Sequence, residues 1–309
     1  MSGKMFKGLN TSTIPRGWVH QNKVMVCLKL GIPISDICCA QNCDDPTIVG
    51  NYNKDYMGDL DIAFDGPIFP GYINGPHKDF WLNLKDHLED LKTNGVIKEY
   101  GLVKGWHQFS ILVPLVNSFY QEATQCFGTS GFLSNERPYI QVDCHLGNVP
   151  WMKQVLGPAS KESKWKALYR TNLLADAINL IQYVIDEEKK IYSKYTMDYK
   201  QGIYKTTFQI VPPTGRQKID QEVILSKELL TSDPNEIHKI LFTGKVPYSF
   251  VLSLNSYEEV YKAMKSDNFK FKELLPQIFT KFYTRLIKEK LEVPQEIIDE
   301  LQLKLFKEV

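Results

Sequence analysis

The chain has 309 residues, of which 43% are hydrophobic and 24% are charged, and its formal net charge is +1. This length and composition are typical of one large folded domain or two small ones, and they exclude an intrinsically disordered chain. The near-zero net charge excludes a bulk electrostatic grip on nucleic acid, so a phosphate-binding surface has to be a local patch.

Hydropathy and cysteine usage indicate the compartment. No stretch approaches the roughly 20 apolar residues that a membrane-spanning helix needs, and residues 1–16 lack the apolar core of a secretory signal. Three of the six cysteines crowd together at Cys38, Cys39 and Cys43, but no second Cys or His pair follows at a spacing typical of zinc sites. We therefore expect a cytoplasmic protein with reduced thiols and no membrane partner.

The first clear elements lie between residues 23 and 64. Residues 23–30 indicate a short strand or a helical turn, and residues 47–50 form an apolar, β-branched run that enters the turn dipeptide Gly50-Asn51. Residues 59–64 then alternate strictly: Asp59 and Asp61 share one face with Ala63, while the other face carries Leu60, Ile62 and Phe64. This alternation predicts a half-buried strand.

A helix and two more strands follow. Apolar residues recur at helical spacing between residues 77 and 94, and Gly95 is a natural residue to end that helix. Residues 106–115 and 138–146 both indicate strands. The second of them carries Asp143 on the face opposite Ile140, Val142 and Cys144.

The pattern changes near residue 160. Ser160 is placed to cap a helix whose apolar stripe includes Trp165 and Tyr169, and beyond Lys190 we expect helices interrupted by one hairpin, at residues 204–211 and 223–226. The prediction is an α+β fold: a small mixed β-sheet core with flanking helices over residues 1–160, followed by a mostly helical C-terminal region over residues 161–309. That region would complete a nucleotide and acceptor site.

The acidic residues are the main chemical signal. Two aspartates one residue apart on a strand point the same way, with their Cα atoms roughly 6.5–7 Å apart. Their carboxylates are suited to hard cations such as Mg²⁺ or Mn²⁺, which prefer oxygen ligands. Two such ions roughly 3.5–4 Å apart are a common device for phosphoryl transfer. An acid between Val142 and Cys144 in an apolar strand is costly unless it has a partner, so Asp143 is the candidate third ligand of Asp59 and Asp61.

These residues together resemble the polymerase-β-like nucleotidyltransferase superfamily. The shared pattern is Ile48-Val49-Gly50-Asn51, then Gly58-Asp59-Leu60-Asp61-Ile62, then Val142-Asp143-Cys144. The resemblance covers roughly residues 46–175. It implies that Asp59 and Asp61 ligate two metal ions and that Asp143 ligates the catalytic ion and helps to activate the acceptor hydroxyl.

The resemblance also indicates how a nucleotide would be held. Gly50 and Asn51 would approach its phosphates, although Asn51 stands where the family usually has Ser or Gly, and Lys54 would support them. A basic run after the third acid is a second candidate for phosphate contact, and it comprises Lys161, Lys164, Lys166 and Arg170. Lys166 and Arg170 are four residues apart and would share one helix face.

The resulting hypothesis is an enzyme that transfers a nucleoside monophosphate from an NTP, such as ATP, to a hydroxyl group and releases pyrophosphate. The acceptor is open between an RNA 3′ end and a protein side chain, and the oligomeric state is not indicated. Two alternatives remain at this point. One is a catalytically inactive protein that keeps the fold for binding or structure; the other is a glycosyltransferase that uses Asp-x-Asp, which leaves Gly50 and Asp143 without a role.

Overall fold

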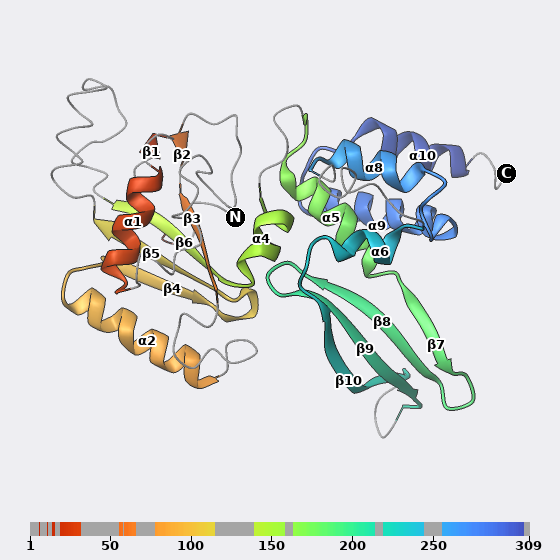
Figure 1. Cartoon of the computed structure of the whole chain (residues 1–309), viewed down its shortest axis with the longest axis horizontal. Coiled ribbons are helices and arrows are strands. Elements are labelled where there is room, and N and C mark those ends of the chain that lie inside the picture. The colour runs from red at the N-terminus through yellow and green to blue at the C-terminus, as the bar shows by residue number, and fades with distance from the viewer. Residues whose placement is uncertain are drawn as a thin grey trace. The chain divides into compact units, whose positions relative to one another are not determined.

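The computed structural model (Figure 1) describes residues 6, 11, 14–15, 19–31, 56–57, 59–65, 78–114, 139–157, 163–213, 219–243 and 255–305. The chain divides into two compact units, Met1–Lys153 and Gln154–Val309. The fold class is α+β, as the sequence predicts, with a mixed four-stranded sheet in the first unit and an antiparallel sheet and helices in the second.

The first unit is built on the mixed sheet, whose strand order is β3-β6-β5-β4. Its strands are β3 (Leu60–Asp65), β4 (Glu99–Val103), β5 (Gln108–Pro114) and β6 (Tyr139–Gly147), and a separate short pair joins β1 (Ile14–Pro15) to β2 (Tyr56–Met57). Strands β3 and β6 run parallel, whereas β5 is antiparallel to both β6 and β4. The strands expected at residues 59–64, 106–115 and 138–146 are confirmed, with the second beginning only after a 3₁₀ turn at Lys104–Trp106.

Two helices accompany this sheet: α1 (Val19–Lys29) contacts β3, and α2 (Lys78–Thr93) contacts β4. A hydrogen bond of 3.3 Å between the His87 ring and the Leu30 carbonyl joins the helices, so both lie on the same side of the sheet. Residues 23–30, which the sequence left open between strand and helix, are thus helical. Gly95 ends α2 with a positive φ of 72°, as the sequence predicts, because only glycine adopts this conformation without strain.

Alternation in the strands separates an apolar face from a polar one. Leu60, Ile62, Val142 and Cys144 are all fully buried, and they pair as Leu60 with Val142 and Ile62 with Cys144. The same register places the alternate residues of β3 and β6, which include Asp61 and Asp143, on the opposite face. The core packing of the sheet therefore fixes where the acids lie.

The second unit contains an antiparallel sheet of order β10-β9-β8-β7, formed by β7 (Gln182–Asp186), β8 (Ile191–Asp198), β9 (Gly202–Val211) and β10 (Gln221–Thr231). The predicted hairpin is confirmed as β9 and β10. Apart from this hairpin, the sequence predicts only helices from Lys190 onward. That prediction is wrong at residues 191–198, which form the strand β8. Strand β7, just before Lys190, is a further strand that the sequence did not predict. Residues 182–198 place β-branched and aromatic residues on both sides of a charged turn, which suits a hairpin even though no regular alternation marks the strands.

The remaining elements of the second unit are helical. They are α4 (Val149–Val155), which spans the boundary, α5 (Ala167–Ile178), α6 (Glu236–Leu241), α8 (Tyr257–Lys265), a 3₁₀ turn at Lys272–Leu274, α9 (Leu275–Lys288) and α10 (Gln295–Leu305). The helix predicted to start at Ser160 begins only at Ala167, and Trp165 precedes it. Ser163 does not extend the helix because its hydroxyl bonds to Glu258 and to the Trp165 carbonyl instead. Ser160 itself lies outside the described residues.

Candidate functional site

The acids of the first unit meet on adjacent parallel strands. Asp61 of β3 is paired in register with Asp143 of β6, and Asp59 lies two residues before Asp61, directly ahead of β3. Neighbouring strands are roughly 4.8 Å apart, so paired side chains on one face are within reach of a shared ligand. The side chain of Asp61 is 17% exposed and Asp143 is 6% exposed. The site is therefore largely desolvated but still open on the Asp61 side.

Two hydrogen bonds hold the Asp143 carboxylate from within the sheet. The Ser110 hydroxyl of β5 donates to Asp143 Oδ1 at 2.6 Å, and the Gln141 amide donates to the same oxygen at 3.0 Å. Both donors are 1% exposed. None of the described residues donates to Oδ2, so both of the described donors hold the same oxygen of Asp143.

The electrostatics of Asp143 follow from this environment. Burial raises the pKa of Asp143 above its ordinary value, and the negative charge of Asp61 acts in the same direction. The hydrogen bonds from Ser110 and Gln141 and the proximity of His145 lower the pKa and only partly offset the burial. A nearby cation would relieve both unfavourable effects, because it compensates the buried charge and screens the like-charge pair.

His145 completes the polar face. Its Nε2 lies 3.0 Å from Asp61 Oδ1, so a proton on Nε2 donates to this carboxylate. Its Nδ1 is buried and has no hydrogen-bond partner among the residues that the structure describes. A histidine that donates to a carboxylate fixes the orientation of that carboxylate, so His145 positions Asp61 much as Ser110 and Gln141 position Asp143.

The described residues do not form a complete metal cage. No three His, Cys, Asp or Glu side chains among them converge to hold an ion, and Asp59, Asp61 and Asp143 are all described, so these three acids do not form a ready-made triad of metal ligands. One oxygen of each paired acid is turned toward a protein donor, Asp61 toward His145 and Asp143 toward Ser110. Mg²⁺ is nevertheless commonly bound by one or two carboxylates together with water and substrate phosphates rather than by an all-protein cage, and the Asp61–Asp143 pair meets that requirement.

Four of the predicted nucleotide-binding residues, Gly50, Asn51, Lys54 and Lys161, lie outside the described residues. Lys164 and Lys166 belong to the second unit, and both are exposed. The ammonium group of Lys164 lies 4.7 Å from the centre of the Trp165 ring and 4.0 Å from a carboxylate oxygen of Glu292.

The structure corrects the role predicted for Arg170. This residue is 2% exposed, and its guanidinium donates to the carbonyl oxygens of Gln154, Val155, Gly157 and Asn255 at 2.8–3.1 Å. Burial lowers its pKa to about 10. Arg170 therefore joins three chain segments of the second unit. It does not share a phosphate-binding face with Lys166, which lies just before the helix and is exposed.

Sequence reasoning missed Ser110 and Gln141. The Gln141 position had a signal, because it precedes Asp143 by two residues and thus shares its face. No sequence signal pointed to Ser110. Its pairing with Asp143 depends on the register between β5 and β6, which the sequence of either strand does not specify.

Comparison of the sequence with protein-family models and with curated proteins finds no match. Within the described parts of the chain, none of the helices combines the length and apolarity needed to cross a bilayer.

Proposed function

We propose that this chain is a metal-dependent nucleotidyltransferase, which transfers a nucleoside monophosphate from an NTP to a hydroxyl acceptor. The observation that carries the proposal is the pairing of Asp61 with Asp143 in register on adjacent parallel strands, with Asp59 two residues ahead. A buried acid opposite a second acid carries a cost in folding free energy, which the hydrogen bonds from Ser110, Gln141 and His145 offset in part and a cationic ligand would reduce further.

The chemistry of the paired acids fits a hard cation. Asp61 and Asp143 supply oxygen ligands, which Mg²⁺ and Mn²⁺ prefer, and Asp59 would have to turn toward them to join as a third. A pair of such ions, when bound, would neutralise the triphosphate and the developing charge on the leaving pyrophosphate. Water and the substrate phosphates would supply the remaining ligands.

The chain's own residues have distinct tasks in the proposed reaction. The acceptor hydroxyl oxygen forms a bond to the α-phosphorus, and the bond from that phosphorus to the pyrophosphate oxygen breaks. Asp143 Oδ2, which receives no hydrogen bond from the described residues, is the oxygen available to take the hydroxyl proton. Ser110 and Gln141 hold the other oxygen in place, and His145 holds Asp61.

The nucleotide and the acceptor extend the same proposal. Gly50, Asn51 and Lys54 would contact the phosphates from the segment before β3, with Lys161, Lys164 and Lys166 as further candidates. The acceptor is an RNA 3′ end or a protein side chain. The small net charge favours a short or structured acceptor over a long nucleic-acid track.

The test is a transfer assay with the full chain. The purified protein is incubated with each α-labelled NTP, Mg²⁺ or Mn²⁺, and either total RNA or cell lysate. We expect label to reach one acceptor class, and we expect Asp61→Asn and Asp143→Asn each to abolish the transfer. Asp90→Asn, an exposed acid on α2, serves as the matched control and should retain full activity. Absence of transfer with every NTP, or full activity in Asp61→Asn, would contradict the proposal.

A further inference from the structure

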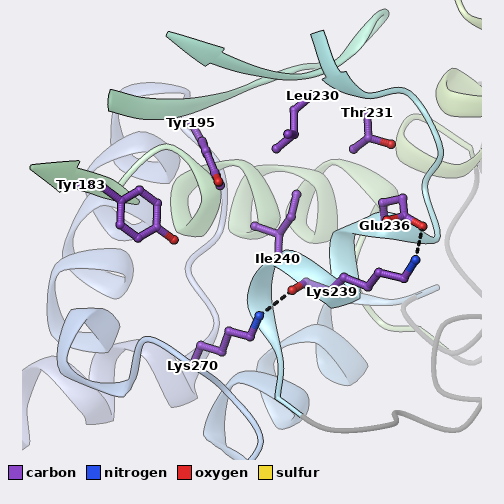
Figure 2. Close-up of a pocket in the computed structure, with 8 residues that line it drawn as sticks. All are labelled: Tyr183, Tyr195, Leu230, Thr231, Glu236, Lys239, Ile240 and Lys270. Carbon is purple, nitrogen blue, oxygen red and sulfur yellow. Dashed lines mark hydrogen bonds and ion pairs between the residues drawn. The ribbon is translucent and has the colours of Figure 1, made fainter. Parts of the chain in front are cut away.

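The second unit contains a pocket that is separate from the acidic residues. It has a volume of about 300 Å³ and lies between one face of the antiparallel sheet and the segments that follow the sheet (Figure 2). Strands β7, β8 and β10 form one wall, and α6 and the residue Lys270 form the other. Six residues carry the argument: Tyr183, Tyr195, Leu230, Lys239, Ile240 and Lys270.

Two tyrosines from the sheet line the pocket. The rings of Tyr183 and Tyr195 meet edge to face, with centroids 5.7 Å apart. Tyr183 is 44% exposed, and Leu230 on the sheet wall is 42% exposed. An exposed tyrosine ring next to exposed aliphatic surface is suited to contact with a flat, partly apolar group, because stacking removes both surfaces from water.

Two lysines also line the pocket. The Lys239 ammonium is paired with Glu236 at 2.6 Å, so its charge is compensated. The Lys270 ammonium donates to the backbone carbonyl of Lys239 at 2.6 Å, and no carboxylate of the described residues forms an ion pair with it. That bond uses one of three ammonium donors. Lys270 is thus held at the pocket without an ion-pair partner among the described residues and with two further donors, which favours an anionic ligand.

We propose that this pocket binds a nucleotide, with the base against Tyr183 and Tyr195 and the phosphate at Lys270. An aliphatic anion would leave the two tyrosines unused, and a neutral aromatic compound would leave Lys270 unused. A nucleotide carries a planar ring and a phosphate on one small scaffold, so it can contact the tyrosines and Lys270 together. The same chemistry occurs in a free mononucleotide and in one unit of a single-stranded RNA. The inference extends beyond the proposed transfer reaction, since none of the three acids lines the pocket.

The test measures binding to the full-length protein in EDTA, which removes the divalent ions that the acidic site requires. Equilibrium dialysis compares AMP, a five-nucleotide oligo(A), adenosine and inorganic phosphate. We expect AMP to bind more tightly than either adenosine or phosphate. Tighter binding of the oligonucleotide than of AMP would identify a strand as the ligand, and the reverse order would identify a free nucleotide.

Two pocket variants and two matched controls locate the binding. Tyr183→Leu and Lys270→Gln should each weaken AMP binding by about tenfold, and Lys270→Gln should leave adenosine binding unchanged. Tyr283→Leu and Lys288→Gln on α9 should bind AMP as the unmodified protein does. Because both pocket residues are exposed, neither change should lower the unfolding temperature.

Three results would overturn the inference. The first is AMP binding no tighter than phosphate and adenosine, and the second is unchanged AMP affinity in both pocket variants. The third is loss of AMP binding in Asp61→Asn under the same metal-free conditions, which would assign the nucleotide to the acidic site. A protein that binds AMP at the pocket but transfers no nucleotide would refute the proposed reaction and leave this inference intact.

Discussion

The hydrogen bond between Ser110 and Asp143 permits a quantitative test of how the sheet holds its buried acid. Removal of the donor by Ser110→Ala should destabilise the first unit by about 1.5–3 kcal/mol, the range for a hydrogen bond to a charged group. The upper part of this range is expected, because the bond is short, at 2.6 Å, and both residues are buried. Gln141 alone would then hold Asp143 Oδ1.

A double-mutant cycle measures how much of this hydrogen bond's contribution to the free energy of unfolding depends on the charge of Asp143. Asp143→Asn keeps an oxygen that accepts from Ser110 but removes the charge, so Ser110→Ala in that background should cost only about 1 kcal/mol, the value for a neutral hydrogen bond. The expected coupling between the two changes is therefore on the order of 1 kcal/mol, well above the roughly 0.3–0.5 kcal/mol scatter of independent sites.

Urea unfolding followed by tryptophan fluorescence is a suitable assay, because four of the five tryptophans belong to the first unit, Met1–Lys153. The measurements are made in EDTA, so that no cation compensates Asp143. The reasoning would be refuted if Ser110→Ala lowered the free energy of unfolding by the same amount in the unmodified protein and in the Asp143→Asn variant. Such a result would mean that the hydroxyl does not support a charged carboxylate at this position.

The remaining predictions concern the second unit and are checked by thermal unfolding. Arg170→Lys should destabilise it by about 3 kcal/mol or more, because one ammonium cannot replace a guanidinium that bonds to four carbonyls; an unchanged melting temperature would contradict this structural role. Gly202→Ala should also cost several kcal/mol, roughly as for an overpacked core site, since φ is +137° and a Cβ would lie 2.2 Å from the Thr231 carbonyl oxygen. Ser256→Ala removes the capping box with Glu259 at the start of α8 and should cost about 1 kcal/mol, whereas no loss would show that the cap is replaced by water.

Local patterns predicted the first unit well where a strand has one apolar and one polar face, as β3 does. The alternation in residues 59–64 was sufficient to place Asp61 opposite Leu60 and Ile62, and helical spacing with Gly95 gave α2 nearly to its ends. The strands β7 and β8 escaped prediction for the converse reason. Four of the five residues of β7 are exposed, so no clear periodicity of burial marks that strand.

The sequence was sufficient to predict which acids belong to the candidate site, but not how these acids are arranged in space. Alternation places Asp61 and Asp143 on the polar faces of their own strands, yet it does not specify that β3 and β6 are neighbours or that these residues are paired. Register between strands distant in sequence arises from tertiary packing. The same limitation explains the error for Arg170, whose carbonyl partners come from chain segments on both sides of it in the sequence.

Hydrogen-bond saturation separates the buried charges of this protein into two kinds. Arg170 gives its donors to four carbonyls, and both oxygens of the buried Asp176 bond to Arg285, so these groups are satisfied by the protein itself. Asp143 differs, because both hydrogen bonds that it accepts from the described residues fall on Oδ1 and its strand neighbour Asp61 carries the same charge. A structural carboxylate gains from partners on both oxygens. An acid held firmly on one oxygen and left open on the other, beside a second acid, is the arrangement expected where a cation and a substrate supply the missing contacts.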